Sequence, residues 1–445
     1  MMKNKFYFIG IKGTGMAALA LILNKLDHNV SGCDLEKHFF TEDLLVENNI
    51  EIQSFENAII PADATVIIGN AFLEDFPLVI KARKNNICYR YHEYLGLFME
   101  NYHTICVTGS HGKTTTTGML SSMMSNFGET GYLIGDGSGK IEKNTKYFCV
   151  EADEYRRHFL AYHPNYAIVT NIEIDHVDYF KTEEDYQLAY EEFISQVKEK
   201  VLIFGDDKNC RKIKDSDKLI WYGIGDNNDL QAKNIVETTS YMSFDLYYLN
   251  EFKYRFNLNL VGRHLLWNAL GVIGIGMLEN VPFETIEDGL NLFKGVKRRF
   301  VIEEHGENVF IDDYAHHPTE VAITIDAART RYPNKKIVAI FKPHRVSRVY
   351  KFAKEFATAL KKADEIFLCD FTSIDDKEEG IDIDIYYLKD MIEDSTVIEE
   401  DESGANILAK ESPAVFLFMS SKDIYPLAEM VKRSQNHWKH FHFIL

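Results

Sequence analysis

The sequence predicts an α/β protein with three domains, in which strands and helices alternate as in doubly wound parallel sheets. Short apolar runs of strand length are followed by segments with helical spacing along almost the whole chain. Two of these runs end in glycine turns that open directly into helices, at residues 10–15 and 109–112. The 445 residues suffice for two to four domains, because domains commonly contain about 100–200 residues.

The first segment, up to about residue 95, has the pattern of a β–α–β unit. An apolar strand at 6–9 leads into Gly10, Gly13 and Gly15, and a helix rich in Ala and Leu follows. Glycine turns at the carboxyl ends of strands are where open α/β sheets bind ligands. The GxxGxG spacing differs from that of a dinucleotide site, and close strand–helix packing is the alternative, above all for Gly15. Further strands are expected at 29–33, 64–69 and 87–91.

The second and third segments continue the alternation. From residue 104 a strand leads into a lysine-containing turn and a helix, and residues 241–260 alternate like a hairpin with its turn at 250–251. Other strands are expected at 147–150, 166–170, 201–204 and 219–222, and helices at 114–126, at 265–278 and from Pro282. From residue 295 the expected strands are 309–312, 336–341, 365–369 and 414–419, and the expected helices are 318–331 and 347–360.

Composition and charge exclude several classes of protein. The chain is 46% hydrophobic and 26% charged, an ordinary globular mixture. Its net charge of -19 argues against general binding to nucleic acid or to membrane surfaces. No apolar run reaches the about 20 residues of a membrane span, and the six cysteines form no CxxC pair. We therefore expect a cytoplasmic protein with reduced cysteines.

The stretch 105–117, ICVTGSHGKTTTT, carries the strongest functional signal. An apolar strand runs into a turn bracketed by Gly109 and Gly112, and Lys113 and Thr114 open the following helix. Backbone N–H groups of such a turn bind phosphate oxygens, the lysine adds a positive charge, and the hydroxyl can bind Mg²⁺. The first glycine comes later than in the common GxxxxGK[ST] pattern. We call residues 109–115 the lysine loop and predict that it binds nucleotide phosphates.

Acidic residues follow two predicted strands of the same segment. Glu151 directly follows the first of them, and His176 lies shortly after the second. If the strands are parallel, their ends meet at the edge that carries the lysine loop, where carboxylates suit Mg²⁺. We expect Glu151 to be a metal ligand and His176 to bind metal or position a charged substrate, with a structural histidine as the alternative. Asp153 and Glu154 are expected to form a solvated turn and a helix cap.

Basic residues and histidines gather after the strands of the third segment, in GVKRRF, DDYAHHPTE and FKPHRVSR. Arginine side chains match phosphate and carboxylate oxygens, so this group suits an anionic ligand. In the second segment Asn268 can pair with the donor and acceptor of a base, or it can cap or pack a helix. The candidate residues of the third segment are Lys297, Arg298, Arg299, Asp313, His316, His317, His344, Arg345 and Arg348.

Together these motifs resemble the Mur ligase family, in the same order and over nearly the whole chain. The matching motifs are GIKGTGM, VTGSHGKTTTT, EADEYRRHFL, TNIEIDHVDYF, GVKRRF, IDDYAHHPTE and FKPHRVSR. The resemblance implies three domains. These are a Rossmann-like domain for a UDP substrate (residues 1–98), a central P-loop-type ATPase domain (99–294) and a Rossmann-like domain for an amino acid (295–445).

The resemblance also implies a reaction, that of an ATP-dependent acid–amino-acid ligase with Mg²⁺ in peptidoglycan precursor synthesis. The branch it resembles joins L-alanine to the lactyl carboxylate of UDP-N-acetylmuramate. The carboxylate takes the γ-phosphoryl group of ATP, and the amine of alanine attacks the resulting acyl phosphate. A sister ligase that attaches a recycled murein peptide to the same sugar nucleotide is the alternative. No nucleic acid and no membrane span are expected, and a homodimer stays open.

By the same resemblance, individual residues receive roles. Lys113 is expected to stabilise the transferred phosphoryl group, and Thr114, Glu151 and His176 to hold Mg²⁺. ATP is expected to contact Gly109, Ser110, His111, Gly112, Lys113, Thr114, Thr115, Asn268, Arg299 and Asp313. Gly10, Gly13, Gly15 and His317 are expected to bind substrate, and His316, Arg345 and Arg348 to act at the amino acid and the acyl phosphate.

Two segments depart from the family pattern. The adenine segment, commonly HNxxNA, is HLLWNA here, and the usual GAGD near the C-terminus is Ser420-Ser421-Lys422-Asp423. Two other classes of function compete with a ligase. An NAD-dependent oxidoreductase would use the first glycine turn but leaves Lys113 without a role, and a regulatory ATPase would bind nucleotide without forming an amide.

Overall fold

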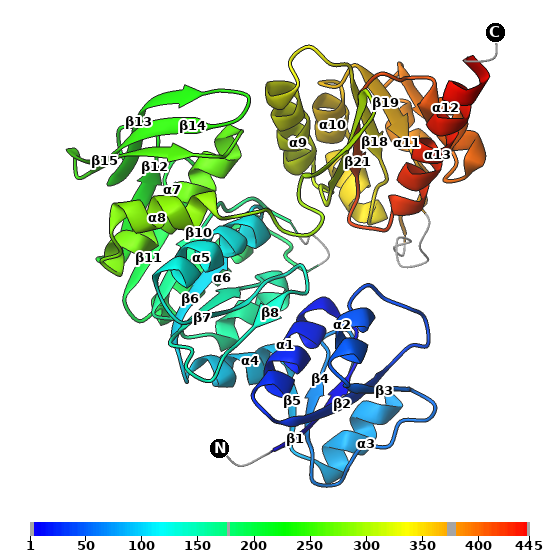
Figure 1. Ribbon diagram of the computed structural model, residues 1–445. Coiled ribbons are helices and arrows are strands. Elements are labelled where there is room, and N and C mark those ends of the chain that lie inside the picture. The colour runs from blue at the N-terminus through cyan, green and yellow to red at the C-terminus, as the bar shows by residue number, and fades with distance from the viewer. Residues whose placement is uncertain (1–3, 176–178, 372–379, 443–445) are drawn as a thin grey trace. The chain divides into compact units, whose positions relative to one another are not determined.

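The computed structural model describes residues 4–175, 179–371 and 380–442 and contains three sheets flanked by helices (Figure 1). The predicted α/β class is confirmed. The chain forms two compact units. The first consists of Met1–Ile235, Ser243–Leu258 and Leu266–Lys294, and the second of Val236–Met242, Asn259–Leu265 and Gly295–Leu445.

The first sheet has five strands in the order β3-β2-β1-β4-β5, and all its neighbours are parallel. Its central strands are almost fully buried, as expected for a parallel sheet with helices on its faces. The strands are β1 (Lys5–Ile9), β2 (Asn29–Asp34), β3 (Glu51–Ser54), β4 (Thr65–Ile68) and β5 (Cys88–Arg90). The helices are α1 (Thr14–Lys25), α2 (Glu42–Glu47), α3 (Pro77–Asn85) and α4 (Tyr91–Met99).

The second sheet has ten strands in the order β15-β14-β13-β12-β11-β10-β6-β9-β7-β8. The strand before the lysine loop, β6 (His103–Thr108), lies between β9 (Tyr147–Glu151) and β10 (Tyr166–Val169) and is parallel to both. The predicted meeting of their carboxyl ends is therefore confirmed. The other strands are β7 (Thr130–Leu133), β8 (Gly139–Lys140), β11 (Lys200–Phe204), β12 (Leu219–Gly223), β13 (Leu230–Glu237), β14 (Met242–Tyr248) and β15 (Glu251–Leu258).

Helices of this part follow the sequence pattern closely. The lysine loop opens α5 (Lys113–Phe127), and α7 (Arg263–Leu278) and α8 (Phe283–Asn291) form where helices were predicted. The predicted hairpin consists of β14 and β15, but its turn is Leu249-Asn250. Both residues have positive φ, as in the turns that best match strand twist. The remaining helices are η1 (Tyr155–Ala161), α6 (Glu183–Gln196) and η2 (Cys210–Lys212).

The third sheet has six strands in the order β16-β17-β21-β18-β19-β20, parallel except for β16. The strands are β16 (Val301–His305), β17 (Asn308–Asp313), β18 (Ile337–Phe341), β19 (Glu365–Leu368), β20 (Ser395–Val397) and β21 (Val415–Met419). The helices are α9 (Pro318–Arg331), α10 (Val346–Leu360), α11 (Tyr386–Lys389), α12 (Glu402–Ala409) and α13 (Tyr425–His442).

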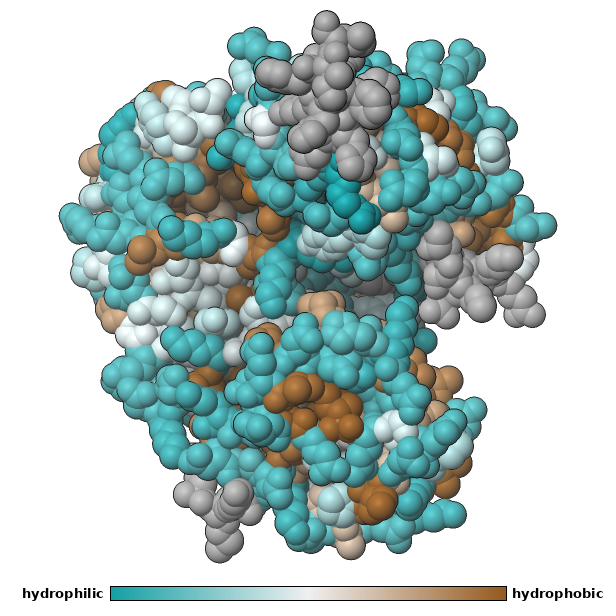
Figure 2. Space-filling view, turned by 45° about the vertical axis from the view of Figure 1, so that its right-hand side comes forward, coloured by the Kyte–Doolittle hydropathy of each residue, from teal (hydrophilic) through white to brown (hydrophobic). Residues whose placement is uncertain are grey.

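The surface and the cysteines agree with the composition. Hydrophilic residues cover most of the face shown in Figure 2, in keeping with the net charge of -19. All six cysteines are free thiols. Within the described parts of the chain, no helix has the length and apolarity needed to cross a bilayer.

Candidate functional site

The lysine loop is held in one conformation by its glycines and by the end of β10. Gly109 and Gly112 have φ of +134° and +82°, values that favour glycine, and a Cβ at Gly109 would lie 2.1 Å from Oγ1 of Thr170. The carbonyl oxygen of His111 accepts hydrogen bonds from Thr170 Oγ1 at 2.5 Å and Asn171 Nδ2 at 2.9 Å. The His111 N–H donates to Asn171 Oδ1. The loop is thus fixed before any ligand binds.

Lys113 reaches across this loop to a buried carboxylate. Its Nζ donates to the carbonyl oxygen of Gly109 at 2.5 Å and to the two carboxylate oxygens of Glu154 at 2.8 and 3.1 Å. Burial lowers the pKa of Lys113, but the charges of Glu154 and Asp153 outweigh it, so the pKa is raised and the ammonium group stays charged. A positive charge is therefore fixed at the mouth of the loop.

Glu154 does not form the solvated turn that the sequence suggested. The residue has no exposed surface, and Tyr186 donates its hydroxyl to Oε1 at 3.3 Å. The prediction was wrong because only the fold brings Lys113 and Tyr186 to this position, whereas spacing along the chain gives no sign of them. Asp153 does behave as expected, since it is exposed and accepts a hydrogen bond from the backbone N–H of Tyr155.

Glu151 lies at the end of β9, beside the start of α5. Oγ1 of Thr114 donates to its Oε1 at 3.2 Å, and the N–H of Gly135 donates to its Oε2 at 2.8 Å. A Cβ at Gly135 would lie 2.4 Å from Oε1, so this glycine admits the carboxylate. A hydroxyl and a carboxylate are hard oxygen donors of the kind that Mg²⁺ prefers. His176, the third predicted ligand, lies outside the described residues.

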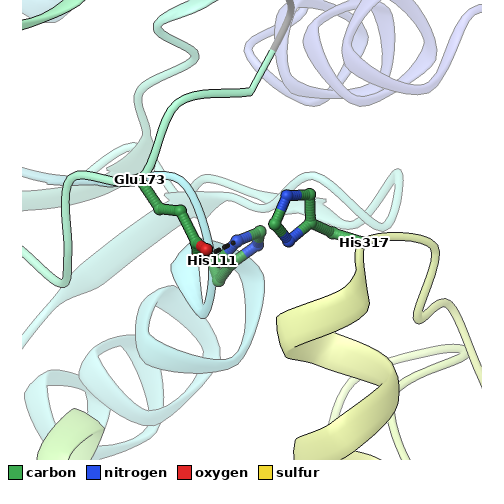
Figure 3. Close-up of side chains that lie close together, drawn as sticks. All are labelled: His111, Glu173 and His317. Carbon is green, nitrogen blue, oxygen red and sulfur yellow. Dashed lines mark hydrogen bonds and ion pairs between the residues drawn. The ribbon is translucent and has the colours of Figure 1, made fainter. Parts of the chain in front are cut away.

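A second pair of polar side chains lies on the other side of the lysine loop. Nε2 of His111 is 3.1 Å from Oε2 of Glu173, and the two side chains point toward each other (Figure 3). Ser110 also binds this segment, because its Oγ donates to the Glu173 carbonyl oxygen at 2.6 Å. No separate role was predicted for Glu173 from the sequence; its position after a parallel strand was the available signal. Glu173 extends the polar edge formed by the ends of β9 and β10.

Asn268 lies next to the lysine loop, on α7. A Cβ built on Gly112 would be 3.1 Å from Oδ1 of Asn268, which places the amide beside the positive-φ turn of the loop. Asn268 is buried. Its contact with a base stays a prediction.

The first glycine turn joins β1 to α1. Gly10 has φ of +85°, and a Cβ there would lie 2.2 Å from the ring of Phe72. Gly13 is the N-cap of α1 and has ordinary φ. A Cβ at Gly15 would lie 2.6 Å from the hydroxyl of Tyr91, which supports close packing as the reason for this glycine. The turn itself lies at the carboxyl edge of a parallel sheet, as ligand sites of such sheets do.

In the second unit, a buried carboxylate ends β17. Asp313 accepts hydrogen bonds from the N–H groups of Phe300 and Ala315, each at 2.8 Å. Burial raises its pKa to about 6. Arg299 lies 3.4 Å from Glu320, whose Oε2 also accepts the N–H of His316 at 3.0 Å.

His317 caps the next helix. It is 1% exposed, and its Nδ1 accepts a hydrogen bond from the N–H of Thr319 at the start of α9. Its predicted substrate contact stays a prediction.

Several cationic side chains surround His344, which follows the end of β18. Burial, together with the charges of Lys422, His316, Arg348 and Arg345, lowers the pKa of His344 to about 3. Arg348 is buried on α10, and Arg345 is the N-cap of that helix with φ of +66°. The structure thus brings together His316, Arg345 and Arg348, which the sequence predicted at one site. Such a group attracts an anion, for example a carboxylate.

Comparison with known proteins agrees with this geometry. Residues 5–103 match the catalytic domain of the Mur ligase family, 107–276 the Mur ligase middle domain, and 298–410 the Mur ligase glutamate ligase domain. The structure is similar to the UDP-N-acetylmuramate–alanine ligase MurC of Thermotoga maritima, with a TM-score of 0.80 and 26% identity over 97% of this chain and 99% of that one.

Two more solved structures share the fold. A murein peptide ligase of Psychrobacter arcticus gives a TM-score of 0.69 at 22% identity, over 97% of this chain and 99% of that one. A MurF ligase of Thermotoga maritima, solved in complex with ADP, gives 0.63 at 17% identity over 92% and 95%. With all three domains matched in order, the chain belongs to the Mur ligase family, the ATP-dependent ligases of peptidoglycan precursor synthesis.

Proposed function

We propose that this chain joins L-alanine to the lactyl carboxylate of UDP-N-acetylmuramate, with cleavage of ATP to ADP and phosphate. The observation that carries the proposal is the lysine loop, in which a rigid turn and the charged Lys113 lie beside Glu151 and Thr114. The similarity to the alanine ligase of Thermotoga maritima over almost the full length of both chains supports the choice of amino acid.

In this proposal the first unit activates the carboxylate. Backbone N–H groups at the start of α5 and the ammonium of Lys113 bind the phosphates of ATP and stabilise the charge of the transferred phosphoryl group. Thr114 and Glu151 would hold Mg²⁺, with His176 as a further ligand. Bound there, the metal supplies charge neutralisation for the phosphates. Gly10 and Gly13 would face the diphosphate of the UDP sugar, and Asn268 the adenine.

The second unit would bind the amino acid. His316, Arg345 and Arg348 are proposed to bind the carboxylate of alanine, so that its amine attacks the acyl phosphate and expels phosphate. Arg299 and Asp313 are proposed to contact the phosphates and ribose of ATP. We propose that the domains for the UDP sugar, for ATP and for the amino acid are separated by boundaries at 98/99 and 294/295.

The alternative is a ligase for a recycled murein peptide, the activity named for the similar protein of Psychrobacter arcticus. The test is phosphate release by the purified protein with ATP, Mg²⁺ and UDP-N-acetylmuramate, and with either L-alanine or the tripeptide. We expect release with alanine and formation of UDP-N-acetylmuramoyl-alanine by mass spectrometry. Release with the tripeptide and none with alanine would overturn the proposal in favour of the alternative.

A further inference from the structure

The turn Ser420–Asp423, which replaces the usual GAGD, is held by two cationic side chains. Nη2 of Arg298 donates to the carbonyl oxygens of Ser420 and Lys422, both at 2.8 Å. Nζ of Lys342 donates to the carbonyl oxygen of Asp423 at 3.1 Å. Three backbone carbonyls of one four-residue turn are therefore fixed by charge-assisted hydrogen bonds, which are stronger than neutral ones.

Arg298 is itself fixed by its surroundings. Its guanidinium lies over the rings of Tyr314 at 5.2 Å and Tyr425 at 5.4 Å, and its Nε is 3.5 Å from Oδ2 of Asp312. The hydroxyl of Tyr425 donates to the same carboxylate at 2.5 Å. The guanidinium of Arg298 thus contacts two aromatic rings, one carboxylate and two carbonyl oxygens, so these contacts hold it against the turn.

Lys342 is anchored in the same way. It is 6% exposed and lies 2.8 Å from Oε2 of Glu400. Because Lys342 is two residues before His344 on the same strand end, it ties the turn to the segment that carries the histidine.

Ser421 is the member of the turn that meets the proposed amino-acid site. Its Oγ lies 2.8 Å from Nδ1 of His344. This hydrogen bond fixes the ring of His344 against rotation whichever of the two atoms donates. The side of the cluster formed by Arg345, Arg348 and Lys422 is cationic. When Ser421 donates to Nδ1, the neutral ring carries its proton on Nε2 and can donate it to a bound carboxylate.

We propose that Ser421 and Arg298 are positioning residues for the amino-acid substrate: Arg298 holds the turn, and the turn's Ser421 holds the ring of His344. This inference rests on the proposed function, because it assumes that the anion attracted by the cluster is the carboxylate of an amino acid or peptide. In this turn, which lacks the usual glycines, backbone carbonyls hold the turn in place and the side chain of Ser421 makes the contact with His344.

The kinetic test compares Ser421→Ala, Ser421→Thr and the control Ser240→Ala, an exposed serine of another turn. We expect Ser421→Ala to raise KM for the amino-acid substrate on the order of tenfold, the effect of one lost hydrogen bond, with KM for ATP and kcat within about twofold. Ser421→Thr, which keeps the hydroxyl, should restore KM, and Ser240→Ala should not change it. Equal changes in both KM values, or none, would contradict the proposal.

Arg298→Gln should likewise raise KM for the amino-acid substrate and leave KM for ATP nearly unchanged. Combined with Ser421→Ala it should add little, because both changes act through His344. Additive effects would mean that Arg298 acts elsewhere. A thermal melt of each variant identifies loss of folding.

A second readout does not depend on turnover. In protein labelled with ¹⁵N-histidine, Ser421→Ala should shift the ring nitrogen signals of His344 in the absence of substrate, and Ser240→Ala should not. If the wild-type protein uses neither alanine nor the tripeptide, the proposed function fails while this comparison still tests Ser421. Unchanged signals of His344 would then overturn the positioning role.

Discussion

Nζ of Lys113 lies 2.8 Å from Oε2 of Glu154, a carboxylate with no exposed surface. The lysine therefore has two tasks, of which a phosphate-binding motif reveals only the first. It presents its charge to the lysine loop, and it neutralises a buried acid. Loss of one member of such a pair leaves an uncompensated charge in the interior, which costs more than loss of both.

This pair predicts the behaviour of Lys113 variants. Lys113→Met should abolish amide formation and also lower the free energy of unfolding by about 3 kcal/mol, because Glu154 is left unpaired. The double variant Lys113→Met/Glu154→Gln should regain most of the stability and none of the activity. Urea unfolding and phosphate release measure the two effects. Activity in the double variant would show that Lys113 does not act on the phosphoryl group.

Glu151 should affect metal use rather than folding. Glu151→Gln keeps the shape of the side chain and removes the charge near Thr114, so the Mg²⁺ concentration for half-maximal activity should rise at least about tenfold. Glu142→Gln, an exposed residue of the same unit, is the matched control. An unchanged Mg²⁺ requirement in Glu151→Gln would remove this residue from the metal site.

The glycines of the lysine loop should be sensitive in a position-dependent way. Gly109→Ala places a Cβ 2.1 Å from Thr170 Oγ1 at a φ of +134°, so we expect loss of ATP binding and destabilisation on the order of 2 kcal/mol. Gly128→Ala, at the other end of α5, should be tolerated, since its φ is -166° and its nearest neighbour, Tyr147, would be 3.6 Å away. Isothermal titration with ADP measures the affinity of each variant for nucleotide, and urea unfolding measures its stability. Equal affinity in the two variants would contradict the fixed loop.

His344 should stay neutral at pH values where histidines ordinarily take up a proton. Burial and the neighbouring cations lower its pKa from 6.5 to about 3. The unfolded chain therefore binds a proton between these two pH values and the folded chain does not, so this group lowers the stability of the folded state as the pH falls from 6.5 toward 3. A ¹³C-histidine NMR titration should show no titration of His344 between pH 7.5 and 5. A midpoint near pH 6 would exclude the cationic surroundings described.

Much of the site edge could be predicted because parallel strands align their carboxyl ends. Once β6, β9 and β10 are recognised as neighbours, Glu151 must lie near the lysine loop, and the structure places it 3.2 Å from Thr114. The same reasoning predicted that His316, Arg345 and Arg348, which follow β17 and β18, lie at one site. These inferences need only the order of strands and their ends.

Other parts could not be predicted because they depend on side chains far apart in the chain. The burial of Glu154 depends on Lys113 and Tyr186, which are 41 and 32 residues away from it. The engagement of Arg298 with Ser420 and Lys422 spans more than 120 residues. A spacing pattern shows which residue types are present, but it does not indicate contacts between residues so far apart in the chain.

The sequence by itself determined the α/β class, the places of the main strands and helices, and the strand–glycine turn–helix form of 109–115. It could do so because strand alternation, glycine turns and helix starts are local properties of the backbone. Only the tertiary structure decided which charges are paired. Burial makes an unpaired charge costly, so the fold joined Lys113 to Glu154 and closed Arg298 onto the turn at 420–423. Through that turn, Ser421 was brought to His344.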